Sequence, residues 1–105
     1  EEELIGFKRV KVVGSGVQDR EHGAWLFTII IDNRYKLQEK LRANQIESNQ
    51  VHFRNDRYSI FDEFTNEKSF PHMDKVEDNY LVLPLHTRMN EADVRRVCAV
   101  IKKGW

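Results

Sequence analysis

The sequence predicts a single α/β domain over residues 1–105: a two-layer α+β sandwich in which two main helices cover one face of a small, largely antiparallel sheet of three or four strands. Three observations support this prediction. The run AWLFTIII at 24–31 is apolar and rich in β-branched and aromatic residues, as in a central strand. Residues 33–44 and 90–102 have the apolar spacing of surface helices. A chain of 105 residues has the usual length of one domain.

The first two strands are expected to form a hairpin. Residues 7–13 alternate between Arg9 and Val12, which indicates a strand with one face in water. The segment 14–23 begins and ends with glycine and is typical of a loop. The apolar strand at 24–31 follows directly, so a long loop joins two neighbouring strands.

The segment after Asp32 predicts an amphipathic helix of about three turns. Asp32 is a favourable N-cap residue. Leu37 and Leu41 lie four residues apart on one helix face. Asn44 is expected to end the helix because Asn tolerates the left-handed conformation, and Ile46 then packs back toward the sheet.

The middle of the chain predicts shorter elements. Residues 50–53 are expected to form a third strand, and residues 58–64 a short helix or turn. Pro71 favours a helix that begins there. Residues 80–85 predict a fourth strand, which ends at Pro84 or lies at an edge because proline donates no ladder hydrogen bond.

The last helix has the clearest signals. Asn90 is expected to cap it, and Asp93 provides the acidic half of a capping box. Four apolar side chains then follow at the spacing of one face: Val94, Val97, Cys98 and Ile101. Cys98 on this face is expected to be a small buried apolar residue rather than a nucleophile. The predicted core consists of Trp25, Phe27, Ile29, Ile31, Leu37, Leu41, Leu81, Leu83, Val94, Val97 and Ile101.

The composition argues against several classes of protein. Lys+Arg and Asp+Glu both number 17, so the excess positive charge of a nucleic-acid binder is missing. No apolar run approaches the roughly 20 residues of a membrane span. The acidic N-terminal residues have no signal-peptide character. The single cysteine forms no internal disulfide, so a cytoplasmic location is expected.

Most candidate sites have weak sequence support. The glycines of GSG at 14–16 follow a strand, but the third glycine and the directly following helix of a dinucleotide site are missing. The four histidines, at positions 22, 52, 72 and 86, include no pair at helical ligand spacing. We predict no metal site, and no residues of this chain are assigned a catalytic role.

The stretch QVHFRNDRYSIF at 50–61 is the best candidate for a binding site. His52 and Arg54 are expected on one face of a strand, opposite Val51 and Phe53, at the mouth of a cleft. Arginine offers a fork of donors to phosphate or carboxylate, and histidine adds another donor. The other interpretation is a strand end whose charges block edge pairing. The residues alone leave both open.

The order of these segments resembles the C-terminal small domain of the DegT/StrS family of PLP-dependent sugar aminotransferases. The resemblance covers about residues 24–103 and departs from the family where Gln45 replaces the usual glycine. The residues that carry the resemblance are Arg34, Leu37, Leu41, Ile46, Leu81, Leu83, Pro84, Leu85, His86, Met89, Asp93 and Val94.

The resemblance implies the function of a part. In the family, a large N-terminal domain supplies the Schiff-base lysine and the phosphate site of PLP, and the active site lies at the interface of a homodimer. The small domain closes over the cleft, where the substrate is a nucleotide-linked keto-sugar. His52, Phe53 and Arg54 are the implied substrate contacts, with Phe53 either stacking on substrate or in the core. None of the eight lysines has a cofactor context, so this chain alone is expected to bind no PLP and to be inactive.

A second hypothesis is a free-standing binding module that keeps the fold of the small domain without catalysis. The length of the natural reading frame distinguishes the two hypotheses. An upstream extension that encodes a cofactor domain favours the enzyme.

Overall fold

The computed structural model describes residues 2–23, 25–65 and 68–105. Its centre is a three-stranded antiparallel sheet in the order β1-β2-β3, formed by β1 Val10–Val12, β2 Phe27–Ile31 and β3 Tyr80–Leu83. Ile29 in the middle strand pairs with Val12 on one side and with Leu81 on the other. The predicted fold class and hairpin are confirmed.

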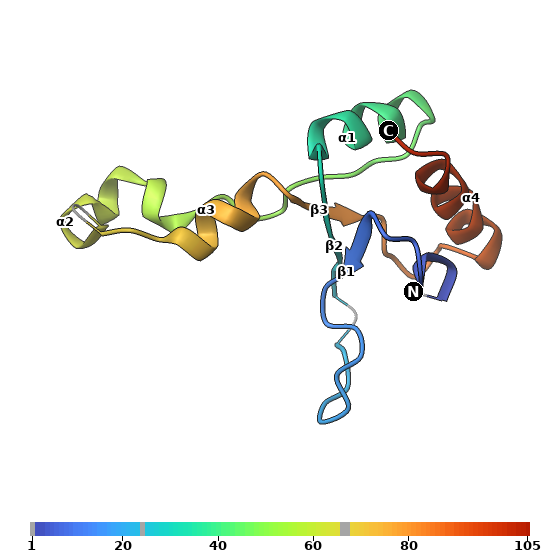
Figure 1. Cartoon of the computed structure of the whole chain (residues 1–105), viewed down its shortest axis with the longest axis horizontal. Helices are drawn as coiled ribbons and strands as arrows, with labels where there is room; N and C mark the ends of the chain where they lie inside the picture. Colours follow the sequence, from blue (N-terminus) through green and yellow to red (C-terminus); the bar gives the residue numbers. More distant parts are fainter. Residues whose placement is uncertain (1, 24, 66–67) are drawn as a thin grey trace.

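The helices of the described residues lie in two groups. The elements are η1 Glu2–Leu4, α1 Arg34–Ala43, η2 Asn55–Arg57, η3 Ser59–Phe61, α2 Asp62–Thr65, α3 Pro71–Glu77 and α4 Glu91–Lys102, where η marks a 3-10 helix. Figure 1 shows α1 and α4 together on one side of the sheet, and α2 and α3 extending away on the other side. The two main helices therefore cover one face, as predicted.

The core lies between this face and the two helices, and we call the face the closed face. Alternate residues of the strands bury their side chains there, and α1, α4, η1 and Ile46, three residues after the end of α1, complete it. Its buried members are Leu4, Ile29, Ile31, Leu37, Leu41, Ile46, Leu81, Leu83, Val97, Cys98, Val100 and Ile101. The predicted positions of Ile46 and Cys98 are confirmed.

Two predicted core residues are wrong, and one is only half-buried. Trp25 is 75% exposed because it precedes β2, at the base of the hairpin loop. Val94 is 38% exposed because α4 turns Val97, Val100 and Ile101 toward the sheet instead. Phe27 packs against the rim of the core and is half-buried.

The start of α1 differs from the prediction, whereas its end is confirmed in position, with Asn44 as the C-cap, but not in backbone conformation. Its N-cap is Asn33, in the left-handed region at φ 49°, and no side chain caps the helix. Asp32 instead accepts hydrogen bonds from Arg9, with Nη2 to Oδ2 at 3.1 Å. At the other end Gln45, not Asn44, adopts the left-handed conformation, at φ 57°. The Ile46 amide donates to the Leu41 carbonyl at 2.9 Å, which completes a Schellman motif.

The N-terminus of α4 is built as predicted. The Asn90 side chain accepts from the Asp93 amide at 3.1 Å, and the Asn90 amide donates to the Asp93 carboxylate at 3.0 Å. This reciprocal pair is a capping box. It fixes the start of the helix that carries a large share of the core.

Residues 50–53 do not form the predicted strand. Asn49 makes an isolated bridge to Val82, with hydrogen bonds of 3.2 and 2.8 Å, and the chain then leaves the sheet. Side chains replace ladder hydrogen bonds beyond that point. The Gln50 amide group donates to the Glu77 carbonyl at 2.5 Å, and the Tyr80 hydroxyl donates to the His52 carbonyl at 2.5 Å.

Residues 50–65 and 68–79 form a projection that we call the arm. It contains η2, η3, α2 and α3, and residues 13–23, in the loop after β1, make a second projection (Figure 1). The radius of gyration is 15.7 Å, whereas a compact domain of this length has about 13 Å. The protein therefore presents much more surface than its core requires.

Candidate functional site

The second face of the sheet carries the candidate site, and we call it the open face. Its side chains are Thr28, Ile30, Tyr80 and Val82, which alternate with those of the core. They form the floor of a hollow of about 1180 Å³ between the sheet and the arm. The wall includes His52, Phe53, Arg54, Asp56, Tyr58, Met73 and Val76, and α1 contributes Arg34 and Tyr35.

His52 is exposed and lines this hollow. Its ring lies 5.9 Å from the ring of Trp25 between centroids, tilted by 55°. The Tyr80 hydroxyl holds its backbone carbonyl. The hydrogen bond from β3 and the ring of Trp25 therefore fix the place of His52 at the edge of the open face.

Phe53 is 58% exposed and does not belong to the core. Its ring meets the ring of Tyr58 edge to face, with centroids 5.1 Å apart. Val51, which was expected beside it on an inner face, is 41% exposed. The side chains expected inside therefore lie on the surface of the hollow, where an aromatic ring is available for stacking.

The prediction that Arg54 points to solvent is wrong. The residue is 7% exposed, and its guanidinium contacts three carboxylates. Nη2 lies 2.5 Å from Asp56, and Nη1 lies 2.5 Å from Asp74 and 3.1 Å from Glu77. A second arginine, Arg57, reaches Glu77 at 2.5 Å. We call these five residues the arm ion cluster.

The cluster shifts the pKa of two of its members, Asp56 and Arg54. Hydrogen bonding from Arg54 lowers the pKa of Asp56, and the charge of Arg54 adds to this effect. The carboxylates of Asp56 and Asp74 raise the pKa of Arg54. The charges of Asp56 and Arg54 therefore persist near neutral pH, and the ion pairs of the cluster tie the start of the arm to α3.

Sequence analysis missed the acidic half of this cluster. Asp74 and Glu77 lie three residues apart on α3, so they face the same side of a helix. That spacing was the available signal. Their distance of 20 and 23 residues from Arg54 gave no indication of the contact.

The other sequence candidates remain separate from the hollow. The Ser15 hydroxyl of the GSG segment donates to the Val12 carbonyl at 3.1 Å within the hairpin loop. Cys98 is buried in the core, and burial raises the pKa of its thiol. The His86 ring accepts from the Arg88 amide at 3.3 Å. Within residues 2–23, 25–65 and 68–105, no three His, Cys, Asp or Glu side chains form a group suited to a metal ion.

The described residues do not form a site for PLP. The residues that line the hollow include no lysine, so the hollow has no side chain to which PLP could attach. Lys40 is the least exposed lysine, and it donates to the Gly104 carbonyl at the far side of α1. The chain therefore lacks, in its described part, the desolvated amine that such a cofactor needs.

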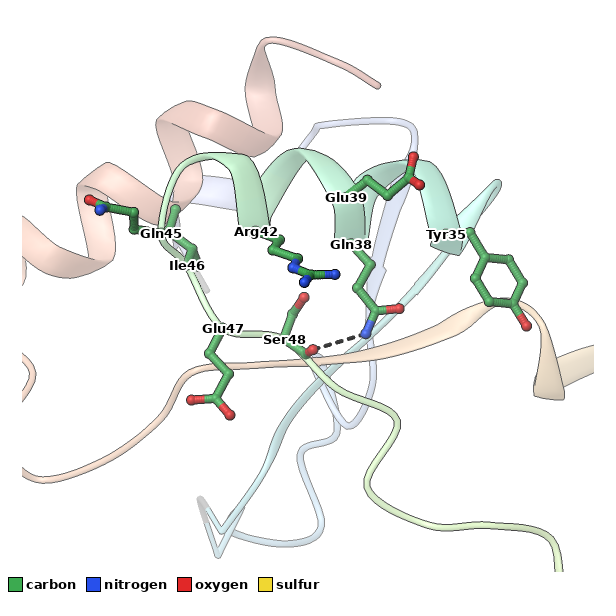
Figure 2. Close-up of a pocket in the computed structure, with 8 residues that line it drawn as sticks. All are labelled: Tyr35, Gln38, Glu39, Arg42, Gln45, Ile46, Glu47 and Ser48. Atoms are coloured by element: carbon green, nitrogen blue, oxygen red, sulfur yellow. Dashed lines mark hydrogen bonds between the residues drawn. The ribbon is translucent and has the colours of Figure 1, made fainter.

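A second hollow, of about 620 Å³, lies between α1 and the segment that follows it. Figure 2 shows Gln38 reaching across it to the segment after the helix, where its amide donates to the Ser48 carbonyl at 3.0 Å. The Ser48 hydroxyl is buried and has no hydrogen-bond partner among the described residues. The lining mixes acidic, basic and amide side chains without a common geometry, so we assign no chemistry to it.

None of the helices in the described part of the chain has the length and apolar character that a bilayer crossing needs.

Comparisons with known proteins agree with this architecture. The model of the DegT/DnrJ/EryC1/StrS aminotransferase family matches residues 2–102. No curated protein sequence matches the chain. An aminotransferase of the same family from Brucella abortus, 23% identical over 97% of this chain, shares the fold with a TM-score of 0.76.

Two solved structures are more similar. The sugar aminotransferase CalS13 from Micromonospora echinospora is 27% identical over 99% of this chain, with a TM-score of 0.88. AtS13 from Actinomadura melliaura is 29% identical over 99% of this chain, also with a TM-score of 0.88. This chain covers 27% of each of those chains, a share consistent with the small C-terminal domain that the resemblance implied. The chain therefore belongs to the DegT/DnrJ/EryC1/StrS aminotransferase family.

Proposed function

We propose that this chain is the C-terminal small domain of a PLP-dependent aminotransferase that acts on a nucleotide-linked keto-sugar. In the complete enzyme it provides one wall of the substrate cleft, and it lies against a large N-terminal domain that holds PLP. The complete enzyme is expected to be a cytoplasmic homodimer. This chain alone supplies no cofactor-binding lysine and performs no transamination.

The observation that carries the proposal is the partly uncovered open face. A sheet of this kind normally buries both faces or exposes a polar one, but here the half-buried Ile30 lies on the floor of a hollow, beside the buried Val82. The arm adds large apolar side chains that are at least 39% exposed: Val51, Phe53, Tyr58, Ile60, Phe61, Phe64, Met73 and Val76. Apolar surface gathered in this way marks a binding or interaction site. This chain covers about a quarter of the length of its relatives, and we propose that the rest of the complete enzyme packs against this surface.

Three residues of the wall are proposed to meet the sugar nucleotide. The exposed ring of His52 offers one nitrogen as donor and one as acceptor to sugar hydroxyls. Phe53 offers an exposed ring face for stacking against a sugar or a base.

Arg54 is proposed to act mainly by holding this wall to α3. Four of its five N–H groups donate to the three carboxylates. One N–H on Nη2 has no acceptor among the described residues, and we propose that a substrate oxygen takes it.

The test uses the complete enzyme. His52→Ala should raise KM for the sugar nucleotide by about 3- to 10-fold, the equivalent of one lost hydrogen bond. PLP content and the melting temperature should stay unchanged. His72→Ala is the matched control, because His72 is also exposed and lies on the arm outside the hollow. An unchanged KM in His52→Ala would remove His52 from the substrate wall.

A further inference from the structure

Arg34 is the most deeply buried charged residue in the described part of the chain. It is 4% exposed and lines the hollow from the first turn of α1. Arg54, the only other buried charged residue there, has three carboxylates around it. Arg34 forms no ion pair with a described residue. The two arginines therefore share a hollow and differ in whether their charge is neutralised.

One polar atom of Arg34 lacks the partner that burial requires. Its Nε is buried and has no hydrogen-bond acceptor among the described residues. The guanidinium lies over the ring of Tyr35, whose centroid is 4.1 Å from the guanidinium carbon. A cation over an exposed aromatic ring recovers only part of the cost of removing a guanidinium from water.

The start of α1 makes this place still more positive. A helix N-terminus carries a partial positive charge, and its first amides have no intrahelical acceptors. Asn33 caps α1 in the left-handed conformation without a side-chain hydrogen bond. The first turn contains no acidic residue. A buried arginine in the first turn of such a helix is poorly stabilised until an anion arrives.

We propose that Arg34 is an anion-binding residue of the hollow and takes an oxyanion, either a phosphate or a carboxylate group. The guanidinium suits both groups because its forked N–H donors match two oxygens at once. The phosphate would come from a ligand in the hollow, and the carboxylate from an acidic side chain of the rest of the enzyme. The site needs no PLP and no amino-group transfer, so it goes beyond the aminotransferase proposal.

The experiment titrates the 105-residue chain with inorganic phosphate and, separately, with acetate, and follows by NMR the backbone amides of the first turn of α1, which the Arg34 variants also contain. Saturable binding at millimolar concentrations, about 4 kcal/mol, is expected for one of the two. Saturation by phosphate alone indicates a ligand phosphate. Equal or stronger saturation by acetate indicates a protein carboxylate. Saturation by neither up to about 50 mM, well above a millimolar Kd, overturns the proposal.

The variants separate binding from structure. Arg34→Met keeps the volume and removes the charge, so it should abolish saturation and leave the melting temperature of the ligand-free chain equal or higher. Arg42→Met is the matched control, because Arg42 is exposed on the same helix, and it should bind like the parent chain. If Arg34→Met does not fold, Arg34→Lys replaces it and should bind more weakly because it lacks the fork. Parent-like binding by a folded Arg34 variant contradicts the proposal. The His52 test measures KM in the complete enzyme, so the two proposals fail separately.

Discussion

The two faces of the same three strands differ in what covers them. On the closed face, Ile29 and Leu81 are fully buried under α1 and α4. On the open face, Thr28, Ile30 and Tyr80 are only half-buried, although Val82 is buried, and a hollow lies between this face and the arm. Stability is concentrated on one side of the sheet. The other side keeps apolar and aromatic groups that the isolated chain does not use, which is the character of a surface built for binding.

The largest expected effect of a substitution lies on the closed face. Ile101→Ala should lower the free energy of unfolding by about 2–4 kcal/mol, because the side chain is fully buried and leaves a cavity. Ile60→Ala removes the same atoms from the arm, where the residue is 76% exposed, and should change stability by at most about 0.5 kcal/mol. Denaturant melts of both variants measure the difference.

A similar loss in the two variants would contradict this comparison. It would mean either that α4 does not dock on the sheet or that the arm packs onto the core in solution. A loss below about 0.5 kcal/mol for Ile101→Ala would indicate that α4 does not dock on the sheet.

The next effect is confined to the arm. Arg54→Ala should expose the amides of α3 to hydrogen exchange, because it leaves the half-buried carboxylate of Asp56 without its main counter-charge and leaves Glu77 paired with Arg57 alone. The amides of α4 should keep their protection, since the ion cluster lies on the other side of the sheet. Arg20→Ala is the control, because its ion pair with Asp19 is exposed in the hairpin loop. Equal loss of protection in α3 and α4 would show that the arm and the core unfold together.

The same cluster predicts a dependence on pH. The pKa of Asp56 is lower in the folded chain than its ordinary value of 3.8, so the carboxylate stabilises the fold above that value. This stabilisation falls as pH decreases through 3.8 and then through the lower pKa of the folded state. Protection of α3 should therefore decrease with acid before that of α4, and Arg54→Ala should remove most of the difference.

The sequence predicts the closed face well and the open face poorly. The spacing of Leu37 and Leu41, and the apolar run of β2, follow from local periodicity, so the sandwich could be predicted. His52 was expected at the surface and lies there. Arg54 was expected at the surface too, but it is buried. The contacts that bury Arg54 join residues about 20 positions apart, and local pattern carries no information about them. Sequence patterns also assign apolar residues to the core of the chain by default. Phe53 and Trp25 lie at the surface instead.

A smaller effect on stability is expected at the N-cap of α4, the helix that covers the closed face. Asn90→Ala should lower the free energy of unfolding by about 1 kcal/mol, because it removes the side-chain acceptor of the Asp93 amide. Asn90→Asp keeps an acceptor and should recover most of this loss. Melts of the two variants provide the measurement. No difference between them and the parent chain would mean that solvent satisfies the first turn of α4 equally well.

The smallest expected effect has the opposite sign. Gln45 adopts φ 57° after α1, a conformation that costs a side-chain-bearing residue about 1–2 kcal/mol, whereas glycine adopts it freely. Gln45→Gly relieves this strain but also gives the unfolded chain more conformational freedom. A net increase of about 0.5 kcal/mol in the free energy of unfolding is therefore expected. The side chain is exposed and lies at the lining of the neighbouring hollow, outside the core, so no contact of the core is removed. Gln45→Ala keeps the strain and should give no increase. A gain with alanine equal to that with glycine would attribute the effect to the lost side chain rather than to the backbone.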